Sequence, residues 1–244
     1  MRRLALALAL MALPAAADDR RSGFDYMGPD TQAMQRDDTA NPGMLWVRDG
    51  EALWTRAEDG RSCADCHGAV DGMRGVAARY PVFDDAPLSL EQRINRCRTK
   101  HQGAAPLAYE TQELLALTAV VAHQSRGLPA APDPDPRLDA VRAEGERLFR
   151  QRQGQLDLAC SQCHDENAGK RLAGNPIPQA HPTGYPLYRL EWQGMGSLQR
   201  RLRNCQGAVR AEPYAYGSAE LVALEAYLMA RARGMPLETP AVRP

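Results

Sequence analysis

Two copies of one short cysteine motif constrain this chain more than any other feature of its sequence. Residues 63–67 read CADCH and residues 160–164 read CSQCH, so both follow the pattern C-x-x-C-H. This pattern is typical of c-type haem attachment, because two thiols at this spacing bond to one haem and the adjacent histidine binds its iron. The sequence predicts two covalently bound haem c groups, with Cys63, Cys66, Cys160 and Cys163 as attachment points and His67 and His164 as iron ligands.

The first residues resemble a secretory signal. Arg2 and Arg3 precede an apolar run over residues 4–13, and three alanines follow at 15–17. A basic start, a short apolar stretch and small residues at the end are the features of a signal peptide. We therefore expect a signal peptide over 1–17 and a periplasmic location. No later segment is apolar enough to suggest a membrane span.

Other uses of the six cysteines remain open. A zinc site would require the two C-x-x-C pairs to meet in one place. A redox C-x-x-C would leave both adjacent histidines without a role. Cys97 and Cys205 stand outside the motifs, and exported thiols tend to pair. A Cys97–Cys205 disulfide is therefore the alternative to separate local roles for these two residues.

The second half of the chain repeats the first. Residues 80–83 (YPVF) match 185–188 (YPLY), and 89–97 (SLEQRINRC) match 197–205 (SLQRRLRNC). Two long repeats indicate two domains rather than a solenoid. We expect an N-terminal cytochrome c-like domain over 18–128, which holds haem 1, and a C-terminal one over 137–244, which holds haem 2. A proline-rich linker over 129–136 would join them.

Each repeat has a helical pattern. Residues 113–124 and 220–231 carry apolar side chains at helical spacing, a G-E-x-L-W/F segment precedes each haem motif, and no alternating strand of useful length appears. Opening helix, haem motif, glycine-rich loop and closing helix resemble the class I cytochrome c fold. The predicted fold class is all-α, with two tandem class I cytochrome c-like domains. Capping residues support this fold class. Ser89 and Ser197 would begin further helices, and Gly127 and Gly234 would end the closing helices.

Charge and composition narrow the classes of partner. Lys and Arg number 30 and Asp and Glu number 30, so no basic excess suggests binding to nucleic acid. Aromatic residues are only 6% of the chain. A large prosthetic group would supply core volume that a chain with so few aromatic side chains lacks.

The second axial ligand of each iron is the next question. Methionine is the usual one in this fold, but none occurs between Met73 and Met195. The candidates are Cys97, His101 and His123 in the first domain, and Met195 and Cys205 in the second. Because Cys97 and Cys205 occupy equivalent repeat positions, one explanation should serve both. The predicted axial pairs are His67 with Cys97 and His164 with Cys205.

An arginine lies four residues before each of these cysteines. Arg93 precedes Cys97 and Arg201 precedes Cys205, and residues at this spacing share a helix face. Arg93 fits equally a place over the Cys97 sulfur and the simpler role of a haem-propionate partner or a solvated helix-face residue. Arg201 is surrounded in sequence by further arginines, which suggests an anion site with bidentate guanidinium contacts. These neighbours are Arg200, Arg203 and Arg210.

Paired haem motifs, each followed by an S-L-x-x-R-x-x-x-C segment, resemble the SoxA family across nearly the whole mature chain. SoxA is the dihaem subunit of SoxAX, the L-cysteine S-thiosulfotransferase of bacterial thiosulfate oxidation. The resemblance implies His/Cys ligation of both haems, a catalytic Cys205 that carries a persulfide, and a substrate-binding Arg201. It also implies a heterodimer with SoxX, a monohaem cytochrome c, and SoxYZ as the carrier protein.

In that family, thiosulfate is joined oxidatively to a cysteine of SoxYZ and two electrons pass to haem. Two alternatives stay open for this chain. One is a dihaem thiosulfate dehydrogenase, which couples two thiosulfates to tetrathionate without a carrier. The other is a periplasmic electron-transfer cytochrome without catalytic activity.

Overall fold

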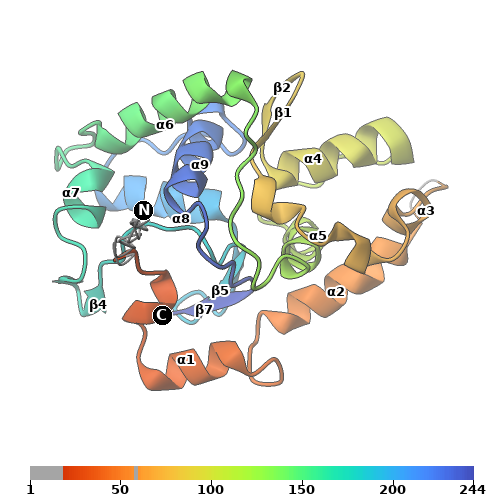
Figure 1. Cartoon of the computed structure of the whole chain (residues 1–244), viewed down its shortest axis with the longest axis horizontal. Helices are drawn as coiled ribbons and strands as arrows, with labels where there is room; N and C mark the ends of the chain where they lie inside the picture. The colour runs from red at the N-terminus through yellow and green to blue at the C-terminus, as the bar shows by residue number, and fades with distance from the viewer. Residues whose placement is uncertain (1–18, 58–59) are drawn as a thin grey trace, which may run out of the picture.

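A computed structural model of the chain describes residues 19–57 and 60–244 (Figure 1). The signal peptide predicted over 1–17 lies outside these residues. The predicted helical character is confirmed in both halves. The helices of the first half are α1 (Pro29–Arg36), α2 (Met44–Thr55), α3 (Cys63–His67), α4 (Leu90–Cys97) and α5 (Gln112–His123). Those of the second are α6 (Asp139–Arg150), α7 (Cys160–His164), α8 (Leu198–Ala208) and α9 (Ala219–Arg231).

Short strands and helical turns connect these helices. The strands are β1 (Val82–Asp84), β2 (Ala86–Leu88), β3 (Arg171–Leu172), β4 (Asn175–Pro176), β5 (Leu187–Arg189), β6 (Gly194–Gly196) and β7 (Ala241–Arg243). β1 pairs with β2 and β3 with β4, while β5 lies between antiparallel β6 and parallel β7. The turns are η1 (Gly23–Tyr26), η2 (Val70–Met73), η3 (Ala77–Arg79), the π-helical η4 (Arg98–Gln102) and η5 (Pro136–Leu138). Every strand has two or three residues, which is too short for an alternating pattern to predict.

Each half is built on one pair of crossing helices, α2 with α5 and α6 with α9. A glycine lies at each crossing. A Cβ atom at Gly50 would collide with the carbonyl oxygen of Ala116, and one at Gly145 with that of Ala223. The glycine of each G-E motif therefore allows the backbones of the opening and closing helices to approach closely.

The two halves lie side by side, with α6–α9 on the left of Figure 1 and α2–α5 on the right. Equivalent residues meet at their interface. The rings of Tyr109 and Tyr216 stack with centroids 5.4 Å apart, and Pro129 forms an antiparallel bridge with Pro236. Each pair occupies the same place in the two repeats, so the duplication is arranged about a pseudo-two-fold axis, as in an isologous dimer.

Gly127 and Gly234 have a different role from the predicted one. The C-cap residues of α5 and α9 are Gln124 and Ala232, so both glycines lie beyond the helix caps. Their φ angles are 80° and 83°, and their N–H groups donate across the interface, to Leu237 O at 2.8 Å and to Ala130 O at 2.7 Å. The prediction that they cap the helices was wrong, because they serve the contact between the halves.

The segments at the expected domain boundaries are well anchored. In the stretch predicted as a linker, Ala131 N donates to Ala78 O at 2.9 Å and Ala130 is 1% exposed. Near the N-terminus, Gln35 Oε1 accepts from Val242 N at 3.0 Å, and α1 lies beside β7 (Figure 1). Residues 20–36, which the sequence assigns to the N-terminal domain, therefore contact the second half of the chain. The domain division at 129–136 stays a prediction.

Candidate functional site

The first C-x-x-C-H motif forms a short helix on the wall of a large cavity. Ser62 caps α3 through a capping box with Asp65, which fixes where the helix begins. Cys63, Cys66 and His67 line a cavity of about 700 Å³. The ring of Trp54 lies against His67, with centroids 5.8 Å apart. The motif therefore presents all three of its functional side chains to one space.

Helix α4 contributes another wall of this N-terminal cavity. Ser89 accepts from Gln92 N and caps α4, as predicted. Arg93 and Cys97 then line the cavity, and so does His101 from η4. Burial raises the pKa of the Cys97 thiol, which the charge of Arg93 offsets only in part. The structure thus brings His67 and Cys97 into one cavity, with His101 as the remaining alternative to Cys97.

The second motif is arranged in the same way in the other half. Cys160, Cys163 and His164 of α7 line a cavity of about 490 Å³. The Nδ1 atom of His164 lies 2.7 Å from the carbonyl oxygen of Pro178. A carbonyl can only accept, so Nδ1 carries the proton and donates. This hydrogen bond fixes the tautomer and leaves Nε2 free to act as a ligand.

Helix α8 brings Cys205 to His164. Ser197 accepts from Arg200 N and caps α8, as predicted, and both Arg201 and Cys205 line the C-terminal cavity. Burial raises the pKa of the Cys205 thiol, but the adjacent His164 and the charge of Arg201 lower it below its usual value. Cys205 therefore favours the thiolate more than Cys97 does.

Two of the competing ligand candidates, Met195 and His123, lie elsewhere. Met195 is 2% exposed and packs in the hydrophobic cluster of the first half, beside Val47. His123 lines neither cavity. All six cysteines are free, and Cys97 and Cys205 line different cavities, which contradicts the disulfide alternative. The two C-x-x-C pairs also lie in separate cavities and cannot share one zinc ion.

The arginines next to Arg201 in sequence do not join it in space. Arg200 lies over the ring of Trp192, 4.2 Å from its centroid, and Arg203 lies over Tyr216 at 4.4 Å. The cavity instead receives Arg189 from β5. Sequence reasoning missed Arg189, although the repeat alignment, which sets it opposite Asp84, carried the signal.

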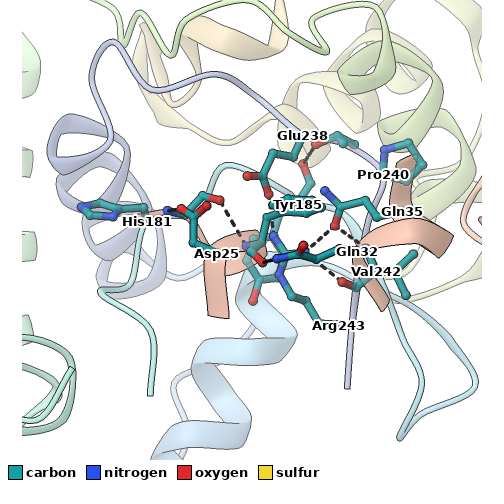
Figure 2. A network of polar contacts seen from close by, with 12 residues as sticks. Asp25, Gln32, Gln35, His181, Tyr185, Glu238, Pro240, Val242 and Arg243 are labelled. Atoms are coloured by element: carbon teal, nitrogen blue, oxygen red, sulfur yellow. Dashed lines mark hydrogen bonds and ion pairs between the residues drawn. The ribbon is translucent and has the colours of Figure 1, made fainter. Parts of the chain in front are cut away.

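A smaller cavity of about 150 Å³ adjoins the same residues. It is lined by His164, Arg201 and Cys205, and also by residues from both ends of the chain, among them Gly23 and Arg243. The Arg243 guanidinium is held at 2.5 Å by Glu238 Oε2 and at 2.5 Å by Gln35 Oε1, within the network of Figure 2. The terminal segments therefore build part of the wall beside Cys205.

The shape and lining of both large cavities fit a bound haem. Each has a C-x-x-C-H helix on one wall and a cysteine from a second helix on another. The linings between are mainly apolar, with Leu117 and Val121 in the first half and Phe149 and Leu224 in the second. Two large cavities beside the helix crossings also explain how a chain with few aromatic residues builds its core.

Two helical domains, each with a C-x-x-C-H motif on the wall of a large cavity, define a protein of the cytochrome c class. In each cavity a further cysteine is available as a sulfur ligand. Its family follows from comparison with known proteins. A family model described as "SoxA/TsdA, cytochrome c domain" matches residues 49–130 and 144–237. The chain belongs to the SoxA family of enzyme subunits, whose cytochrome c domains bind haem c, and the predicted family and fold class are confirmed.

Individual relatives agree over most of the chain. The "L-cysteine S-thiosulfotransferase subunit SoxA" of Rhodovulum sulfidophilum is 38% identical, over 93% of this chain and 81% of its own length. That of Pseudaminobacter salicylatoxidans is 39% identical, over 93% and 82%. The crystal structure of SoxXA from P. pantotrophus superposes with a TM-score of 0.89 at 30% identity, and covers 92% of this chain and 87% of that one.

Within residues 19–57 and 60–244, no helix is both long enough and apolar enough to cross a membrane.

Proposed function

We propose that this chain is the dihaem subunit of an L-cysteine S-thiosulfotransferase that joins thiosulfate to a cysteine of the carrier SoxYZ. The observation that carries the proposal is the pairing of Cys205 with Arg201 in one cavity beside His164. Among the described residues, no carboxylate lies within ion-pair distance of Arg201. A cysteine that favours its thiolate and a guanidinium beside it suit sulfur chemistry on an anion.

The proposed cofactors are two haem c groups. Cys63 and Cys66 would attach the first and Cys160 and Cys163 the second. His67 and Cys97 would be the axial ligands of the first iron, and His164 and Cys205 those of the second. Haem supplies a one-electron acceptor when bound, and thiolate ligation donates electron density to it.

The net reaction forms one sulfur–sulfur bond and releases two electrons. The carrier thiol and thiosulfate give a carrier-bound thiosulfonate, with one proton released. Because a haem accepts one electron at a time, several haems in the complex would share the two electrons. A SoxX-type monohaem cytochrome c is the proposed partner, supported by the similarity to the SoxXA complex.

Each residue of the C-terminal site has a distinct task. Cys205 is the proposed catalytic residue and carries a persulfide. The outer persulfide sulfur would bond to the outer sulfur of thiosulfate as two electrons are released to haem, and the carrier thiolate would then attack that thiosulfate sulfur, break the new bond and restore the persulfide. Arg201 binds the dianion and stabilises the negative charge that builds up as sulfur is transferred. His164, held by Pro178 O, keeps its orientation beside Cys205. Export through the signal peptide at 1–17 would place this chemistry in the periplasm.

Replacement of the catalytic sulfur tests the proposal. In the complex with the SoxX-type partner, we expect Cys205→Met to lower thiosulfate- and SoxYZ-dependent turnover on the order of 1,000-fold, because Met can bind iron but cannot carry a persulfide. Cys97→Met makes the same change in the other cavity and should lower this turnover far less. The measurement is the mass of SoxYZ together with reduction of a cytochrome acceptor.

The outcomes separate the candidate functions. Full turnover by Cys205→Met would exclude the catalytic role. Tetrathionate made without SoxYZ would identify a thiosulfate dehydrogenase. Haem reduction and reoxidation with no sulfur product in any assay would identify an electron-transfer cytochrome.

A further inference from the structure

The internal repeat reverses one charge next to the proposed substrate arginine. Residues 80–84 read YPVFD and residues 185–189 read YPLYR. These segments end in β1 and β5, which occupy the same place in the two halves. Asp84 in the first half is therefore replaced by Arg189 in the second.

In the N-terminal half this position neutralises the local arginine. Asp84 Oδ2 lies 2.6 Å from Arg93 Nη1. The hydroxyl of Tyr80 forms a further hydrogen bond with the same guanidinium. Arg93, the counterpart of Arg201, is thus already paired and has little charge left for an anion.

In the C-terminal half the same position adds a second positive charge. Arg189 and Arg201 line the same two cavities as Cys205. The Arg189 side chain is 12% exposed. Burial, and then the charge of Arg201, lower the pKa of Arg189, which indicates that the two guanidiniums are close enough to repel each other. Such an arrangement costs free energy unless an anion lies between them.

Few counter-charges oppose this pair. Glu191 Oε2 lies 2.8 Å from Arg189 Nη2, but the Glu191 side chain is 64% exposed, so solvent screens it strongly. The ring of Trp192 lies 5.2 Å from the Arg189 guanidinium. Arg243 also lines the small cavity, but Glu238 already pairs with it. Two guanidiniums, those of Arg189 and Arg201, therefore meet at this site, opposed by the exposed carboxylate of Glu191 and, at Arg201, by the sulfur of Cys205.

We propose that Arg189 is a second positioning residue for the substrate anion, and that it binds a small divalent sulfur oxyanion together with Arg201. The inference rests on the proposed function and extends it to a residue outside the S-L-x-x-R-x-x-x-C segment. The small cavity, at about 150 Å³, lies below the range of about 300–1,000 Å³ that larger organic ligands occupy. Its size and charge suit an ion of a few atoms.

The test is equilibrium dialysis of radiolabelled thiosulfate against the holo complex with its monohaem partner, in the absence of SoxYZ. Arg189→Gln should weaken binding about ten-fold, equivalent to about 1.4 kcal/mol, and should raise KM more than it lowers kcat. Arg189→Lys should recover part of the affinity, because it keeps the charge but not the bidentate geometry. Glu191→Gln should tighten binding about two-fold, since it removes the counter-charge.

A matched control separates this effect from net charge. Arg147→Gln removes one positive charge from the exposed face of α6, where Arg147 pairs with Glu144, and should leave thiosulfate binding unchanged. Unchanged thiosulfate affinity in Arg189→Gln would overturn the inference. Loss of haem absorbance in Arg189→Gln with unchanged thiosulfate affinity would also overturn it, because Arg189 would then contact the cofactor.

Failure of the underlying function gives a different result. An unaltered complex that binds no thiosulfate and leaves SoxYZ unmodified contradicts the proposed function itself. An unaltered complex that turns over, with Arg189→Gln indistinguishable from it, contradicts only the role of Arg189.

Discussion

At the scale of single residues, the two halves place the same side chains in different electrostatic surroundings. Cys97 and Cys205 both follow an arginine by one helical turn. Burial raises the pKa of Cys97, whereas His164 and Arg201 lower that of Cys205. The contact with His164 is the larger of these two effects on Cys205 and the charge of Arg201 adds to it, whereas beside Cys97 the charge of Arg93 is paired with Asp84. A duplicated motif thus yields one neutralised pocket and one positively charged pocket.

Most site residues could be predicted from sequence because covalent haem attachment demands fixed spacing. The motif residues share a cavity with Cys97 in the first half and with Cys205 in the second, in line with the equivalent repeat positions of these two cysteines. Arg200 and Arg203 do not, because helix positions one or two residues from Arg201 point to other faces. Arg189 was missed because it lies in a strand outside the S-L-x-x-R-x-x-x-C segment, although the repeat alignment sets it opposite Asp84.

At the scale of elements, a glycine at each helix crossing lets the opening and closing helices approach closely. The G-E-x-L-W/F pattern predicted the opening helices but not the reason for the glycine. That reason is the approach of two backbones, which becomes visible only once α6 lies against α9. The short strands were not predicted either, because two or three residues carry no periodicity.

The crossing glycine gives a stability prediction. Gly145→Ala should lower the free energy of unfolding by about 1–3 kcal/mol, because the added Cβ collides with the carbonyl oxygen of Ala223 and the helices must separate. Chemical denaturation of the holo protein measures this change.

Gly207→Ala is the matched control. Gly207 lies in α8 with nothing within 4 Å of an added Cβ. Alanine there should stabilise the protein by about 0.5–1 kcal/mol through helix propensity. Equal effects of the two variants would contradict the account of the crossing.

At the scale of the whole molecule, the pseudo-two-fold interface buries carboxyl groups. The duplication was clear from the sequence, but the docking of its halves was not, since no local pattern predicts which equivalent residues meet. Glu91 and Glu225 are each 8% exposed and line one cavity of about 70 Å³ between the halves. Burial raises the pKa of both carboxyls, and for Glu225 the charge of Glu91 raises it further.

This interface makes stability depend on pH. A carboxyl whose pKa is raised in the folded state stabilises the fold fully below the unfolded pKa, near 4.5. That contribution is lost as the pH rises through the folded pKa. Glu225→Gln should therefore raise the free energy of unfolding at pH 8 on the order of 1–2 kcal/mol and flatten its decline with pH.

Gln199 Nε2 donates to Glu225 Oε1 at 2.6 Å, and a glutamine oxygen can accept this hydrogen bond in its place. Thermal unfolding between pH 4 and pH 8 measures the profile, with exposed Glu113→Gln as the control. An unaltered slope in Glu225→Gln would show that this carboxyl does not titrate in the folded protein.

The account as a whole depends on a cysteine sulfur bound to each iron. Near-infrared magnetic circular dichroism of the holo protein, which reports iron–thiolate ligation, tests this most directly. We predict thiolate signatures from both haems, with one lost in Cys97→Met and the other in Cys205→Met. Bands of histidine or methionine ligation in the unaltered protein, or spectra unchanged by Cys205→Met, would contradict the account.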